Sequence, residues 1–126
     1  MPAKTSLPVQ ITLTVEQDDS PVRGNAVASG DGDADREVED EILARLDSGD
    51  VWAWAFVAVT ATLNVEGQTF IGRDTLGCCC YRDEAEFRAD AYFSDMKTEA
   101  MRDLHNTIQG AIRRGTVASD ALATFY

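Results

Sequence analysis

Hydrophobic and polar residues alternate at the start of the chain. Over residues 8–16 every second side chain is apolar, and polar side chains stand between them. This period of two predicts a half-buried strand. Residues 17–32 are rich in Asp, Ser, Gly and Pro, which indicates a long loop with room for a short strand at 26–28.

A helical pattern follows at 33–48. Val38, Ile42 and Leu46 recur every four residues, acidic side chains fill the first turns, and Gly49 can end the helix. We expect the apolar stripe to be buried and the opposite face to be solvated. That solvated face carries Glu37, Glu41 and Arg45, with Glu39 and Asp40 nearby.

Residues 51–63, of which the first nine are all apolar, predict a strand in the centre of a sheet, covered on both faces at least at its start. Trp52, Trp54 and Phe56 would share one face of this strand. Such a row can bind a partner, so Trp52 and Trp54 are candidate interface residues. Burial under a helix is favoured, because an exposed patch of this kind would lower solubility.

The rest of the chain predicts a hairpin and a long helix. A turn at 64–67 leads into a second strand at 68–76, where Gly72 marks a bulge or a close approach. Residues 83–115 have helical spacing, and Gly115 can end the helix. The apolar positions of this helix are Phe93, Met96, Ala100, Leu104, Ile108 and Ile112.

The order strand, helix, strand, strand, helix predicts an α+β fold, with a small antiparallel sheet of about three strands packed by two amphipathic helices. With 126 residues, 44% of them hydrophobic, we expect one domain over 1–126, with a loop at 17–32 and a C-terminal tail at 116–126. The apolar runs are shorter than the ~20 residues of a membrane span, and a signal-peptide pattern is missing. We therefore expect a soluble, cytoplasmic protein.

Negative charge dominates the composition. The chain has 22 acidic and 11 basic residues and a net charge of −11, of which residues 31–50 carry −7 and residues 83–103 carry −4. This balance disfavours bare nucleic acid and anionic membranes and favours basic partners. Acidic helices can present carboxylates as a duplex presents phosphates, although acidity also simply keeps small proteins soluble. The candidate partner-binding residues are Asp33, Asp35, Glu37, Asp40, Glu41, Asp83, Glu84, Glu86, Asp95 and Glu99.

The spacing of Asp31, Asp33 and Asp35 is that of an EF-hand calcium loop. The same loop requires a Gly at its sixth position and a Glu at its twelfth, and these positions hold Arg36 and Ile42. Both replacements remove needed chemistry, so helix capping explains these acids better.

Three consecutive cysteines occupy positions 78–80. An odd cluster is not a disulfide framework and is typical of a reducing compartment. On an extended chain only Cys78 and Cys80 converge, so zinc would also need His105 and an acid such as Asp74, without the paired spacing of known zinc sites. Small buried thiols are favoured over a zinc site or a Cys nucleophile with His105 as base. We therefore expect no metal, no cofactor and no enzymatic activity.

Three segments carry a resemblance to other proteins: GDVWAWA at 49–55, DTLGCCCY at 74–81 and YFSDM at 92–96. With these segments the last two-thirds of the chain resembles small acidic proteins of phages and plasmids. The resemblance implies a mobile-element setting, in which small acidic proteins include anti-CRISPR and anti-restriction proteins. We therefore hypothesise an inhibitor that binds a basic, nucleic-acid-binding host defence complex. The alternative is a structural or accessory protein that self-associates as a homodimer, with its acidity serving solubility.

Overall fold

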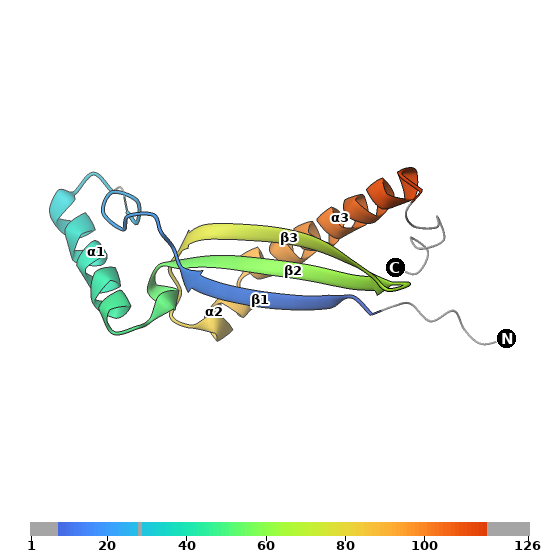
Figure 1. Cartoon of the computed structure of the whole chain (residues 1–126). Helices are drawn as coiled ribbons and strands as arrows, with labels where there is room; N and C mark the ends of the chain where they lie inside the picture. The colour runs from blue at the N-terminus through green and yellow to red at the C-terminus, as the bar shows by residue number, and fades with distance from the viewer. Residues whose placement is uncertain (1–7, 28, 116–126) are drawn as a thin grey trace. The chain divides into compact units, whose positions relative to one another are not determined.

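A computed structural model describes residues 8–27 and 29–115, and it confirms the α+β fold. Its elements are β1 (Gln10–Gln17), α1 (Gly32–Asp47), the short 3-10 helix η1 (Val51–Ala53), β2 (Ala55–Val65), β3 (Gln68–Cys79), α2 (Glu84–Ala89) and α3 (Ala91–Arg113). The strands form one antiparallel sheet in the order β1-β2-β3, with β2 in the middle (Figure 1). No helix of the described residues is long and apolar enough to span a bilayer.

The described residues form two compact units, and each strand contributes to both. Unit 1 comprises residues 8–13, 59–74 and 93–115, and unit 2 comprises residues 14–27, 29–58 and 75–92. The single domain expected over 1–126 stays a prediction, and the tail expected at 116–126 lies outside the described residues.

In unit 1, α3 packs on one face of the hairpin formed by β2 and β3. Every second residue of β2 is buried, and α3 buries side chains at the expected spacing of three and four, although Ala111 is more deeply buried than Ile112. Glu66 and Gly67 both have positive φ values, 50° and 81°, as a two-residue hairpin turn of type I′ requires. The predicted hairpin and the core stripe of the long helix are confirmed.

Gly72 brings β3 against the backbone of α3. A Cβ atom at this position would contact the Ala100 carbonyl oxygen and would lie 2.7 Å from the Leu104 Cα atom. Only glycine therefore fits, and the expected close approach is confirmed. One residue later, the Arg73 N–H donates to the Asp103 carboxylate at 2.9 Å.

In unit 2, the strand predicted from residue 51 begins only at Ala55. The Asp50 carboxylate accepts the Trp52 N–H at 3.1 Å and starts η1 in place of a strand. The prediction that Trp52 and Trp54 share a strand face is therefore wrong. Trp52 packs against the rings of Tyr81 and Phe87, at centroid distances of 6.4 and 5.5 Å.

Trp54 belongs to a different cluster, under α1. It packs with Val22, Ile42 and Ala53, and its Nε1–H donates to the Ser20 carbonyl at 2.8 Å. The loop before α1 forms a turn in which the Ala26 N–H donates to the Val22 carbonyl at 3.1 Å. The short strand considered at 26–28 is not formed at residues 26 and 27.

The buried stripe of α1 differs from the predicted one. Val38 is 39% exposed, whereas Glu39 is 7% exposed and lies in line with Ile42 and Leu46. Glu39 was expected on the solvated face, and it is buried because the preceding loop supplies hydrogen-bond donors to its carboxylate.

The long helix predicted from residue 83 is divided at Asp90. The Asp90 backbone is extended, with ψ of 151°, and ends α2. Its carboxylate then accepts the Tyr92 N–H and the Tyr81 hydroxyl, both at 3.1 Å. These bonds begin α3 afresh, as an N-capping side chain does.

Replacing Gly72 by Ala should destabilise the protein by about 3 kcal/mol or more, because the new methyl group meets helix backbone that cannot move alone. The control is Gly32→Ala at the start of α1, where a Cβ meets nothing within 4 Å. Urea denaturation followed by circular dichroism measures both. Equal unfolding midpoints for the two variants would show that the close approach is absent.

Candidate acidic binding surface

The acids at the start of α1 hold the helix end. The Asp31 carboxylate accepts the N–H groups of Asp33 and Ala34, at 3.1 and 3.2 Å. The Asp35 carboxylate accepts the N–H and the hydroxyl of Ser29. The expected capping role of Asp31 is thus confirmed, and Asp35 is used inside the unit.

Four other carboxylates of α1 share one side of the helix. Asp33, Glu37, Asp40 and Glu41 line a shallow surface groove, and we call these four residues the α1 acidic row. The groove also contains Arg36 and Ala44. Positions 33, 37 and 41 follow one another at four-residue steps, which are about 6 Å along the helix axis.

Most of the α1 acidic row has no neutralising partner. Among the described residues, the carboxylates of Asp33, Glu37 and Glu41 make no ion pair. Asp40 pairs with Arg23 at 2.5 Å. Three adjacent negative charges therefore face solvent without an ion pair among the described residues, and Arg36 is the one basic residue that lines the same groove.

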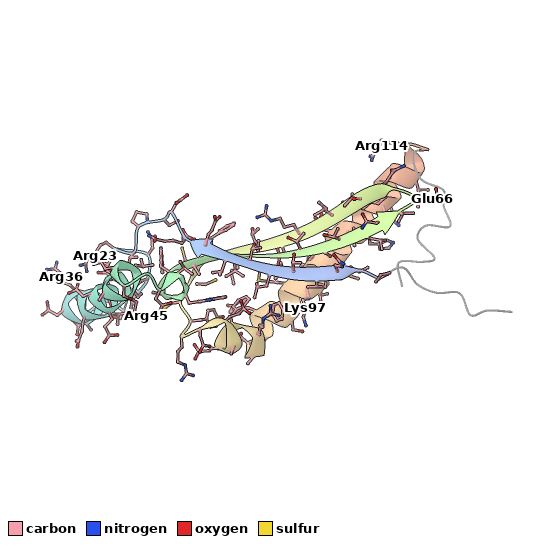
Figure 2. All side chains as sticks on the ribbon, turned by 60° about the horizontal axis from the view of Figure 1, so that its bottom comes forward. Arg23, Arg36, Arg45, Glu66, Lys97 and Arg114 are labelled. Carbon is pink, nitrogen blue, oxygen red and sulfur yellow. The ribbon has the colours of Figure 1, made fainter. Side chains whose placement is uncertain are left out.

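Buried Glu39 anchors the row from behind. Its carboxylate accepts the Gly24 N–H at 2.8 Å and an Arg23 N–H at 3.1 Å. The Gly24 N–H and then the Arg23 guanidinium hold the pKa of Glu39 below its ordinary value of 4.5. Figure 2 shows Arg23 beside α1 and Arg36 on it. Glu39 therefore ties the helix to the preceding loop.

Arg45 fixes the other end of α1 (Figure 2). Its guanidinium pairs with Asp50 at 2.8 Å and donates to the Tyr81 carbonyl at 2.5 Å. The helix is thus held at both ends by charged hydrogen bonds, which orient the α1 acidic row on a fixed support.

The predicted partner-binding acids of α2 are already engaged. Asp83 accepts the Glu86 N–H at 2.9 Å and caps the helix. Glu84 pairs with Arg88 at 3.0 Å, and Glu86 pairs with Arg82 at 2.9 Å. These i,i+4 pairs cancel much of the charge that this helix could offer to a partner.

Two further predicted acids, Asp95 and Glu99, lie on α3. Both are exposed, and Glu99 pairs with Arg102. They belong to unit 1, whereas the acids of α1 and α2 belong to unit 2. Of the ten predicted acids, the structure thus gathers four into a row on α1.

The two candidate interface tryptophans serve the core. Trp54 is 2% exposed and Trp52 is 9% exposed. Both rings are buried within unit 2. The sequence favoured core burial over an exposed aromatic patch, and this prediction is confirmed.

The cysteine cluster is split between core and surface. Cys79 is buried, and burial raises the pKa of its thiol to about 11. Cys78 and Cys80 are exposed, so the expectation of small buried thiols is confirmed for Cys79 alone and is wrong for these two. Within the described ranges, no three His, Cys, Asp or Glu side chains come together in a group able to hold a metal.

Sequence reasoning missed the residues that position this surface. Glu39 had a readable signal, since it lies three residues before Ile42 on the apolar stripe, and an acid there must find a partner. The partner, Arg23, is separated from Glu39 by 16 residues, and no pattern along the sequence links the two.

Asp18 was missed as well. It is 8% exposed and accepts the N–H groups of Ser20 and Cys78, at 2.7 and 2.8 Å. These two hydrogen bonds, the one from Ser20 first, lower the pKa of Asp18 below 3.8.

The surface presents a fixed row of negative charge. The described residues of the groove include no nucleophile and no set of metal ligands. Comparison of the chain with models of protein families, with curated proteins and with solved structures finds no match.

Stability should depend on the charge of Glu39. Because its pKa is lowered in the folded state, its contribution is present above the ordinary pKa of 4.5 and is lost as the pH falls through the folded value. Glu39→Gln should therefore be less stable than the natural chain at pH 7, and the difference should shrink in acid. Urea denaturation at a series of pH values measures this.

Glu37→Gln is the matched control, because Glu37 lies on the same helix without an ion pair among the described residues. It should change stability little at any pH. A difference between Glu39→Gln and the natural chain that stays constant from neutral to acidic pH would contradict the proposed anchor.

Proposed function

We propose that the protein is a non-enzymatic inhibitor carried by a mobile element. Its α1 acidic row would bind the basic, nucleic-acid-binding surface of a bacterial defence complex, in the manner of an anti-CRISPR protein or a DNA mimic. The observation that supports this most directly is the contrast between helices. The acids of α2 are paired with arginines, whereas three carboxylates of the α1 acidic row are unpaired among the described residues.

Electrostatics favours a basic partner for this row. Carboxylates on an exposed helix attract lysine- and arginine-lined surfaces, which include the grooves that hold nucleic acid. The same charges repel phosphates, so direct binding of nucleic acid to α1 is disfavoured.

The magnitude of the charge limits what α1 can replace. The helix has 16 residues and a net charge of −5. It is about 24 Å long, and B-DNA of that length carries about 14 phosphate charges. With about a third of that charge, α1 would cover a basic patch of a few residues and would not substitute for a whole duplex.

The support under the row should strengthen binding. Glu39 and Arg45 hold the helix before any partner arrives. A surface that is already ordered loses less conformational entropy on association than a flexible one does. The carboxylates therefore meet the partner in a geometry that folding has already set.

Neutralising the three unpaired carboxylates of the α1 acidic row should weaken binding while leaving the fold intact. We expect Asp33→Asn, Glu37→Gln and Glu41→Gln together to weaken binding by about tenfold or more, since exposed charges control such encounters. Asp40 is left unchanged because it pairs with Arg23. The measurement is affinity purification from a bacterial lysate at low salt, release at high salt and identification by mass spectrometry.

A second step tests function. Each recovered protein is mixed with labelled duplex DNA, and the natural chain should displace the duplex whereas the triple variant should not. The matched control is Glu16→Gln, Asp19→Asn and Glu66→Gln, which removes three exposed charges outside α1. If both triple variants lose binding and duplex displacement to the same extent, the effect comes from net charge alone.

Other outcomes would overturn the proposal. If the recovered proteins do not bind nucleic acid, the α1 acidic row is not the inhibitory surface. The same conclusion follows if the triple variant recovers the same proteins as the natural chain. Recovery of the chain alone or as its own oligomer at any salt concentration would favour the self-associating accessory protein instead.

A further inference from the structure

The strand β1 lies at an edge of the sheet, and the described chain does not cover it. No residue of β1 is buried, whereas most residues of β2 beside it are. Ile11 is 38% exposed, and Leu13 and Val15 are only partly buried. These three side chains alternate along the strand and share one face, and we call them the β1 apolar row. The described residues thus leave this row without the cover that its pattern calls for.

The backbone of β1 is open on one side as well. In an antiparallel sheet, every second residue of an edge strand points its N–H and C=O groups away from the sheet. Within the described sheet, β1 pairs with β2 alone (Figure 1). An apolar row beside such outward groups is suited to pairing with a further strand, which would cover both.

β1 lacks the features that commonly prevent edge strands from pairing. It has eight residues, compared with about five to six in a typical strand, and residues 10–15 include no charged residue and no proline. The other edge strand, β3, differs. The Arg73 N–H of β3 donates to the Asp103 carboxylate at 2.9 Å, and Cys78 has a φ of 55°, outside the range of a regular strand. The edge best suited to pairing is therefore that of β1.

We propose that β1 pairs with β1 of a second copy of the chain, antiparallel and around a two-fold axis at Leu13. In this register Ile11 lies opposite the partner's Val15, so the two β1 apolar rows lie side by side on one face. On the other face Thr12 lies opposite the partner's Thr14, and such threonine pairs can hydrogen-bond across strands. Two three-stranded sheets thereby join into one continuous sheet.

Charge favours a second copy as the partner at this edge. In the same register Glu16, the one charged residue of β1, lies opposite the partner's Gln10, so no like charges meet. Two chains that each carry a net charge of −11 repel each other least along an uncharged segment, which residues 10–15 provide. A basic partner would instead be drawn to the α1 acidic row.

This dimer is independent of the proposed inhibitory function, and salt distinguishes the two. Salt screens the repulsion between two negative chains, so the dimer should become tighter as salt rises. Binding of the α1 acidic row to a basic surface should instead weaken. A monomeric chain that still binds a host protein overturns the dimer alone, and a dimer that is recovered with a basic host protein satisfies both proposals.

Sedimentation equilibrium of the full chain, from micromolar to submillimolar concentration, tests the dimer. We expect the natural chain to be in equilibrium between monomer and dimer. Thr12→Glu with Thr14→Glu sets carboxylates opposite each other in both threonine pairs, and Thr12→Lys with Thr14→Lys does the same with ammonium groups. Each double variant should dimerise about tenfold more weakly, because like charges directly opposite are destabilising. An equal mixture of the two should restore the dimer, because each mixed pair joins opposite charges.

Ile71→Glu with Thr75→Glu is the matched control, because both residues are exposed and lie on β3, the other edge. It adds the same two charges as the glutamate variant of β1, and it should leave the dimer dissociation constant within about threefold, since distant exposed charges are screened. Circular dichroism verifies that each variant is folded.

Four results would overturn the proposal. They are a natural chain that stays monomeric, a mixture of the two β1 variants that stays monomeric, an equal loss in the β3 control, and β1 amides that are as protected from hydrogen exchange in the monomer as in the dimer. The last result would show that another part of the same chain covers the edge.

Discussion

Asp18 connects three segments of unit 2 that are far apart in the sequence, through its carboxylate and its backbone N–H. It accepts N–H groups from Ser20 and from Cys78, and the Asp18 N–H donates to the Trp54 carbonyl at 3.0 Å. The loop that supplies Arg23 to α1, the beginning of β2 and the end of β3 are therefore joined at one residue. Both the loop behind the acidic surface and Cys78 at the end of β3 are held in position by this junction.

Regular periodicity made much of the fold predictable. The strand β1, the hairpin turn and the stripe on α3 all follow from residues close in sequence, although the half-burial predicted for β1 is wrong, since Ile11 is exposed and Leu13 and Val15 are only partly buried. Three other errors share one cause, which is a carboxylate that bonds to backbone. Asp50 begins η1, Asp90 divides the long helix, and Glu39 is buried on α1. Hydropathy patterns do not record such bonds, and of the three only Glu39, an acid on an apolar stripe, gave a readable signal in the sequence.

The candidate surface was predictable to a smaller degree. The acids of α1 were identified from charge and helical spacing, and the pairs Arg82 with Glu86 and Glu84 with Arg88 are also visible as i,i+4 spacing. The sequence could not show that Arg23 reaches Glu39 and Asp40, because that contact depends on how a long loop folds. The set of carboxylates without an ion pair therefore depends on the folded structure and cannot be predicted from the sequence.

The contact at Gly72 also sets the position of α3 along the sheet. A sliding movement of one helical turn, about 5.4 Å, would place a different pair of residues against Gly72 and would shift every buried side chain of α3 from its place. The missing side chain thus works as a register mark for the helix. In related chains, position 72 should therefore stay glycine even where the side chain at position 100 changes, because the contact is with helix backbone.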